Sequence, residues 1–147
     1  MRRLHKFLLL PAAEQRLLIS ASLLLLVVKV GLVLLPFRTV RSMLAKLMGL
    51  HLGFRGVNHC PAEKIVWAVE LAGHLIPRAS TCLTQALTAQ VLLLRRGHPA
   101  LVHIGTVKGE GGELRAHAWV ESGGDVVIGE YDLEQYTPLV ILNGGGR

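Results

Sequence analysis

Cysteine is scarce in this chain of 147 residues, which contains only Cys60 and Cys82. Two thiols cannot build a disulfide scaffold or supply the four thiolates of a structural zinc site. Aromatic residues make up 5% of the chain and charged residues 18%, whereas hydrophobic residues make up 51%. A composition this apolar excludes an intrinsically disordered chain. The chain therefore folds as one compact unit or lies partly in a membrane.

Common cofactor motifs are also absent from the sequence. It has no phosphate-binding loop, no dinucleotide-binding fingerprint and no His-Glu-x-x-His zinc helix. We therefore expect neither a cofactor nor a metal.

Basic charge is concentrated in the N-terminal third. The first 50 residues carry eight Lys or Arg residues and a single acid, Glu14, in a chain whose net charge is +6. These basic residues are diluted among Leu and Val without aromatic interleaving, so we do not expect nucleic acid as a partner. A basic, apolar segment rather indicates an anionic lipid surface or an acidic protein partner.

The most hydrophobic segment runs from Leu17 to Leu35 and is long enough, as a helix, to cross a membrane. The alternative is a helix entered at Pro11, stopped by Pro36 and buried in the domain, with Lys29 reaching solvent. We favour burial, because the sequence has no second span and the other helices need a cover. A secretory signal peptide fits less well, so we expect a cytoplasmic protein, with membrane association through this helix as the open alternative.

The rest of the chain reads as helices followed by strands. One helix begins near Phe37 and ends about Leu52, a loop covers 53–58, a second helix opens at Pro61 and ends before Pro77, and a third runs from Cys82 to about Arg96. Ser80 or Thr81 is its expected N-cap, and Gly97 its stop. The period then changes to two, which predicts antiparallel strands over 100–107, 114–121 and 125–131. The predicted class is α+β, with at least one helix packed on an antiparallel sheet.

Cys82 and His117 are the candidate catalytic residues. In the first turn of a helix, free N–H groups and the positive end of the helix dipole stabilise a Cys82 thiolate. His117 lies on a predicted strand, sharing a face with Trp119 and Glu121. An imidazole on a strand can serve as base and acid for a thiolate on a helix packed against that sheet. Cys60 is interpreted as a small buried structural residue.

The sequence around these residues resembles the transglutaminase-like cysteine proteases of lasso-peptide biosynthesis, the B-protein leader peptidases. The likeness is carried by the following segments: Ser80-Thr81-Cys82-Leu83-Thr84-Gln85-Ala86-Leu87, Leu92-Leu93-Leu94-Arg95-Arg96-Gly97-His98-Pro99-Ala100, Ala116-His117-Ala118-Trp119-Val120-Glu121 and Tyr136-Thr137-Pro138-Leu139. The resemblance implies a helical N-terminal part over 1–57, a papain-like core over 58–142 and, after it, a disordered tail over 143–147. It also implies hydrolysis of a precursor peptide between its leader and its core.

Carried over residue by residue, the resemblance places the nucleophile on Cys82 and the general base on His117. The family's third member is an aspartate about a dozen residues after the histidine, but this chain has Gly129 there. In a hairpin turning at residues 123–124, His117 would lie opposite Glu130, which is therefore the predicted orienting carboxylate. Asp132 is the alternative, because a β-bulge would shift the pairing.

Other roles follow with less specific signals. The backbone N–H of Cys82 is the expected oxyanion donor, with the side chain of Gln85 as a further candidate that fits a structural role better. Trp119 is expected beside the catalytic pair or in the core.

The chain has no spare module to recognise a leader, so we expect a separate small leader-binding protein, together with an asparagine-synthetase-like cyclase. Two alternatives remain open: a non-enzymatic, membrane-associated peptide-binding scaffold, and thioester acyl transfer to an amine.

Overall fold

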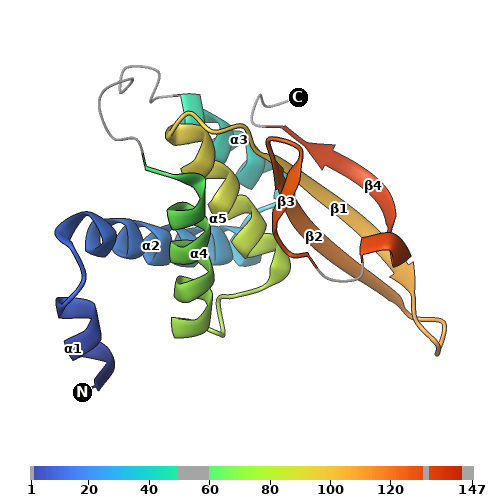
Figure 1. Cartoon of the computed structure of the whole chain (residues 1–147). Coiled ribbons are helices and arrows are strands. Elements are labelled where there is room, and N and C mark those ends of the chain that lie inside the picture. Colours follow the sequence, from blue (N-terminus) through green and yellow to red (C-terminus); the bar gives the residue numbers. More distant parts are fainter. Residues whose placement is uncertain (1, 50–59, 131–132, 144–147) are drawn as a thin grey trace.

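The computed structural model describes residues 2–49, 60–130 and 133–143, and it has helices on one side of a single sheet (Figure 1). The helices are α1 (Arg2–Leu8), α2 (Ala12–Leu34), α3 (Phe37–Gly49), α4 (Ala62–Leu75) and α5 (Cys82–Arg95). The strands are β1 (Leu101–Lys108), β2 (Leu114–Ser122), β3 (Asp125–Ile128) and β4 (Thr137–Leu142), with a 3-10 turn, η1 (Leu133–Gln135), before β4. The predicted α+β class is confirmed.

The long apolar segment forms α2, as the flanking prolines predict. Pro11 occupies the N-cap, and Leu35, next to Pro36, is the C-cap in an extended conformation. Five of its residues are at most 4% exposed and join the core: Leu17, Leu18, Ala21, Leu25 and Val28. Among the described residues, α2 is the one helix with the length and hydropathy to cross a membrane.

The middle helices each bury an apolar face. In α4, Ile65, Val69 and Ala72 are buried, whereas Leu75 in the last turn is exposed. In α3, Val40 and Leu44 face the core. The predicted loop over 53–58 and the predicted end of the preceding helix near Leu52 lie outside the described residues, as does the tail over 144–147. The domain boundary between 57 and 58 stays a prediction.

Helix α5 has strong signals at both ends. Thr81 is the N-cap, and it forms a capping box in which its hydroxyl accepts from the Thr84 N–H at 3.2 Å and its own N–H donates to Thr84 Oγ1 at 2.7 Å. At the other end, Gly97 adopts a positive φ of 82°, as a helix-terminating glycine does. The capping box therefore makes Cys82 the first residue of α5.

The sheet is antiparallel, with strand order β3-β2-β1-β4. β4 was not predicted. It pairs with β1 on the side away from β2 and so completes an edge that the predicted meander left open. The amide of Gln90 in α5 donates to the Leu142 carbonyl at 2.7 Å, tying β4 to the helices.

The core lies between the helices and one face of the sheet. α5 packs on β2 and is flanked by α2 and α4, and Figure 1 shows these helices beside the sheet. The cluster of buried residues contains Ala118 and Val120 of β2 together with Val102 of β1. This layer therefore uses alternate residues of each strand, as the pleat requires.

Candidate active site

Cys82 lies at the exposed start of α5. In the capping box, each of Thr81 and Thr84 donates its backbone N–H to the side-chain oxygen of the other. These two bonds stabilise the first turn of α5. The N-terminal N–H groups of a 14-residue helix create positive potential at this position. The exposed thiol is thus accessible to a substrate.

His117 lies in β2 and is held by a backbone carbonyl. Its Nε2 is 2.8 Å from the carbonyl oxygen of Gly129. A carbonyl can only accept, so Nε2 carries the hydrogen, and in the neutral ring the lone pair is on Nδ1. A fixed tautomer with a free Nδ1 lone pair is what a general base needs.

Two aromatic rings pack against the imidazole of His117. The Trp119 ring lies 6.1 Å away, centroid to centroid, at 23°, and the Tyr136 ring lies 5.2 Å away at 37°. Trp119 also stacks on His103 of β1 at 5.4 Å and 7°. These four side chains, which we call the aromatic cluster, limit the movement of the imidazole.

Two glycines make room for this arrangement. A Cβ on Gly105, which pairs with His117, would lie 3.1 Å from atoms of the Trp119 ring. Gly129 has a φ of +81°, and a Cβ there would lie 2.8 Å from the Ala118 carbonyl. A side chain at 129 would therefore be strained and crowded. The backbone carbonyl of Gly129 occupies the place of an orienting group instead.

The predicted pairing of His117 with Glu130 is wrong for the described ladder. Glu121 pairs with Val126 as expected, but a bulge follows, Val120 pairs with Ile128, and the ladder ends there. The extra residue shifts the register by one, so Glu130 is not brought opposite His117. Glu130 is exposed, and its role as orienting carboxylate stays a prediction. Asp132, the alternative, lies outside the described residues.

Gln85 lies one turn after Cys82 and is engaged elsewhere. Its amide donates to the hydroxyl of Ser80. A Cβ on Gly73 of α4 would lie 2.7 Å from the Gln85 amide nitrogen, so α4 and the start of α5 approach closely here. These contacts support the structural interpretation of Gln85, and the oxyanion role of Gln85 and of the Cys82 N–H stays a prediction.

The two candidate catalytic groups are not bonded to each other. No hydrogen bond within the described ranges joins the Cys82 thiol and the His117 imidazole. The core cluster to which α5 contributes contains Ala118 and Val120, the alternate residues of β2, whereas His117 and Trp119 share the other face. A catalytic pair would therefore need the thiol and Nδ1 to come together when a substrate binds, as catalytic contacts often do.

Other titratable groups have structural partners. Cys60, interpreted above as a buried structural residue, is only partly buried at the edge of the core, and its main-chain carbonyl accepts from His98 Nε2 at 2.7 Å. His103 Nε2 lies 3.0 Å from the Glu121 carboxylate, but the two groups are not aligned as a hydrogen bond. The place of His103 in the aromatic cluster was not predicted, because a lone histidine on a strand belongs to no recognisable motif.

Tyr136 and the Gly129 carbonyl were missed for different reasons. Tyr136 was noted only as part of the resemblance, because its approach to His117 depends on how the chain returns through η1 to β4. The Gly129 carbonyl was missed because a backbone acceptor has no sequence signature.

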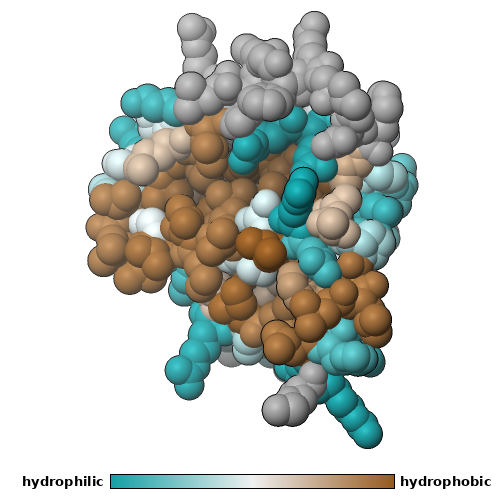
Figure 2. All heavy atoms as spheres, turned by 90° about the vertical axis from the view of Figure 1, so that its left-hand side faces the viewer, coloured by the Kyte–Doolittle hydropathy of each residue, from teal (hydrophilic) through white to brown (hydrophobic). Residues whose placement is uncertain are grey.

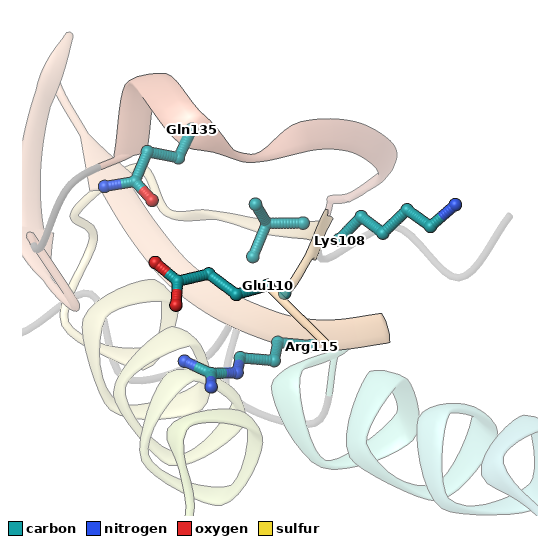
Figure 3. Close-up of a pocket in the computed structure, with 6 residues that line it drawn as sticks. Lys108, Glu110, Arg115 and Gln135 are labelled. Atoms are coloured by element: carbon teal, nitrogen blue, oxygen red, sulfur yellow. The ribbon is translucent and has the colours of Figure 1, made fainter. Parts of the chain in front are cut away.

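A polar pocket lies at the end of the β1–β2 hairpin where the turn joins the two strands. It has a volume of about 410 Å³, and Lys108, Glu110, Arg115 and Gln135 contribute to its lining (Figure 3). None of the residues that line it belongs to the aromatic cluster or to the start of α5.

Comparison with known proteins agrees with this fold. No curated protein and no solved structure matched the chain. The family model described as the transglutaminase-like superfamily matches residues 31–141, well over half of the chain, and the match includes Cys82, His117 and Gly129. The chain belongs to the transglutaminase-like superfamily.

Proposed function

We propose that the protein is a cysteine peptidase that removes the leader from a ribosomally made lasso-peptide precursor. The observation that carries the proposal is the exposed Cys82 thiol at the capped start of α5, in a chain of the transglutaminase-like superfamily. Members of such a superfamily perform thiol-based acyl chemistry, and the lasso-specific part rests on the resemblance of the segments around Cys82 and His117.

The proposed reaction begins when Nδ1 of His117 takes the proton of the Cys82 thiol. The thiolate attacks the carbonyl carbon of the last leader residue, and the N–H groups at the start of α5 stabilise the resulting oxyanion. The C–N bond then breaks as the imidazolium gives its proton to the amine of the departing core peptide. The leader remains as a thioester on Cys82.

Hydrolysis completes the cycle. His117 takes a proton from water as the resulting hydroxide attacks the thioester carbonyl. The C–S bond then breaks to release the leader as a carboxylic acid, and the imidazolium returns its proton to the Cys82 thiolate. During both steps the Gly129 carbonyl accepts from Nε2–H, and this acceptor stabilises the positive charge of the imidazolium.

The proposal includes partners. The substrate is the precursor peptide, a separate small protein binds its leader, and an asparagine-synthetase-like cyclase acts on the released core. Because the precursor is made on ribosomes, the reaction belongs in the cytoplasm.

A reconstituted cleavage assay tests the proposal. Precursor, leader-binding protein and enzyme are mixed, and the released leader is measured by mass spectrometry. Cys82→Ala is expected to abolish cleavage, because it removes the nucleophile. Cys60→Ala is the matched control and is expected to retain cleavage, because it truncates a small structural thiol. Equal loss from both variants would contradict the assignment of Cys82.

The same assay distinguishes the alternatives. Recovery of the leader mainly as an amide of an amine present in the mixture, rather than as the free acid, would favour acyl transfer. Binding of precursor without any covalent adduct on Cys82 would favour a scaffold. If the enzyme alone is as fast as the full mixture, the proposed leader-binding partner is wrong.

A further inference from the structure

Helix α2 is apolar on all sides, but the domain covers only one of them. The buried side consists of the five core residues given above. The opposite side is a stripe at helical spacing, which we call the outer stripe, and its residues are 40–73% exposed: Ile19, Leu23, Leu26, Val27, Val30, Val33 and Leu34. A helix that is hydrophobic all round normally lies inside a protein or in lipid. The outer stripe is therefore a surface in need of a cover.

The outer stripe is large and continuous. From Ile19 to Leu34 it extends over about 22 Å of helix at 1.5 Å per residue. Single exposed apolar residues are ordinary on protein surfaces, whereas a contiguous patch marks an interaction site. α1 and the residue that follows it add exposed Leu4, Leu8 and Leu9. Figure 2, viewed from the side on which α1 and the start of α2 lie in Figure 1, shows broad hydrophobic areas broken by scattered hydrophilic side chains.

The charge of this region indicates the chemistry of the cover. α1, α2 and α3 carry eight Lys or Arg residues and one acid, Glu14, which is paired with Lys64 at 3.0 Å. Arg2, Arg3 and Lys6 are exposed on α1 itself. Apolar side chains beside an excess of basic ones complement an anionic lipid surface, where acyl chains and acidic headgroups lie side by side.

The buried side of α2 decides between lying on a membrane and crossing it. Its five core residues pack in the same cluster as residues of α4 and α5. A spanning α2 would have to withdraw all of them from that core and leave a cavity along its length. A helix that lies in the plane of the interface keeps this packing and inserts only the outer stripe.

We infer that the protein docks peripherally on anionic membranes, with the outer stripe of α2 inserted into the interfacial region and the basic residues of α1 on the headgroups. The inference is independent of the proposed peptidase activity.

Vesicle sedimentation with the full chain tests the inference. The probes are vesicles of phosphatidylcholine alone and vesicles of phosphatidylcholine with one third phosphatidylglycerol. We expect the protein to sediment with the anionic vesicles and to bind neutral ones at least about tenfold more weakly. High salt is expected to weaken binding to the anionic vesicles without abolishing it, because the apolar contact remains.

Two variants separate the apolar and the charged contributions. The triple variant of Leu23, Val27 and Val30 to Ser is expected to weaken binding by roughly a hundredfold. Its matched control changes Leu114, Leu139 and Ile141 to Ser, which are 57–75% exposed on the strands, and is expected to bind like the wild type. The triple variant of Arg2, Arg3 and Lys6 to Gln is expected to bind at least about tenfold more weakly, whereas Arg78, Lys108 and Arg115 to Gln is the control of equal charge.

The outcomes that overturn the inference are distinct. Equal vesicle binding by the outer-stripe variant and its control would show that the stripe is not inserted. Protein that resists extraction by alkaline carbonate would establish a spanning helix instead. A dimer in solution that the outer-stripe variant dissociates, without vesicle binding, would assign the stripe to a second copy. If the outer-stripe variant does not fold, the charge variant decides, since it leaves the core untouched.

Discussion

The two faces of β2 carry different kinds of side chain, although they alternate along one strand. Ala118 and Val120 point into the core formed with the helices. His117 and Trp119 lie on the other face, with His103 and Tyr136. The first face is small and aliphatic because α5 packs directly on it, and the second consists of rings that stack on one another. One strand thus separates the residues that hold the fold from those that position an imidazole.

This division implies that substitutions on the two faces should fail in different measurements. A residue of the core face should change the free energy of unfolding and leave the chemistry of the remaining folded protein intact. Replacing the imidazole on the other face should change the rate more than the free energy of unfolding.

In the comparison between the two faces of β2, the largest effect is expected for His117→Ala. Loss of the general base should lower kcat for precursor cleavage by at least roughly a hundredfold, while the thermal midpoint changes little. Val120→Ala should lower the free energy of unfolding by roughly 2 kcal/mol, because it leaves a cavity in a fully buried site, with kcat of the folded fraction retained. Denaturant unfolding and the cleavage assay measure the two quantities. A His117→Ala protein that cleaves normally would remove the imidazole from the mechanism.

Most of the helices and strands that form the core were predictable from the sequence, because they depend on hydrophobic periodicity and on residues that begin or end an element. The prolines around α2, the capping residues of α5 and the two-residue period of β1 and β2 are local features. β4 was not predictable in the same way, since its residues 137–142 gain their order only by pairing with β1, a strand some 30 residues earlier. Helix α1 was missed because its seven residues are too few for a clear period.

The face of β2 that carries His117 and Trp119 was predictable only in part. Cys82 and His117 stand in recognisable contexts, but the group that holds His117 does not. A single bulge between Val120 and Glu121 shifts the register, so the predicted partner of His117 is not opposite it. No sequence pattern indicates where such a bulge forms. The acceptor turned out to be a main-chain oxygen of a glycine, which every residue type has and no motif records.

The next largest effect is expected at Gly129, which approaches Ala118 closely and whose carbonyl accepts from His117. Gly129→Ala should lower the free energy of unfolding by at least about 2 kcal/mol, since it forces a side chain into a left-handed conformation against the Ala118 carbonyl. Gly112→Ala is the matched control, because Gly112 has nearly the same φ, +82°, and nothing within 4 Å of the added Cβ. It should cost roughly 1 kcal/mol. Equal losses in denaturant unfolding would show that the close approach at Gly129 is of no consequence.

A smaller effect is expected at the start of α5. Thr81→Ala removes a hydroxyl that accepts from the Thr84 N–H and should lower the free energy of unfolding by about 1 kcal/mol. Thr81→Ser retains the acceptor and should restore most of this loss. The rate of Cys82 alkylation by iodoacetamide, measured on the folded protein, should fall with Thr81→Ala as the first turn frays. Unchanged alkylation would mean that the cap serves stability alone.

The smallest expected effect distinguishes a carbonyl from a carboxylate beside His117. Nε2 already has its acceptor in the Gly129 carbonyl, and Glu130 is exposed beyond the end of the β2–β3 ladder. Thiolate nucleophiles also depend less on a third member than hydroxyl nucleophiles do, because the thiol ionises more readily. Glu130→Gln should therefore leave kcat within about threefold of the wild type. A tenfold or larger fall would restore Glu130 as the orienting carboxylate, and a loss confined to Asp132→Asn would move that role to Asp132. With both variants active, the pair formed by Cys82 and His117 relies on a main-chain oxygen, which no side-chain substitution can remove.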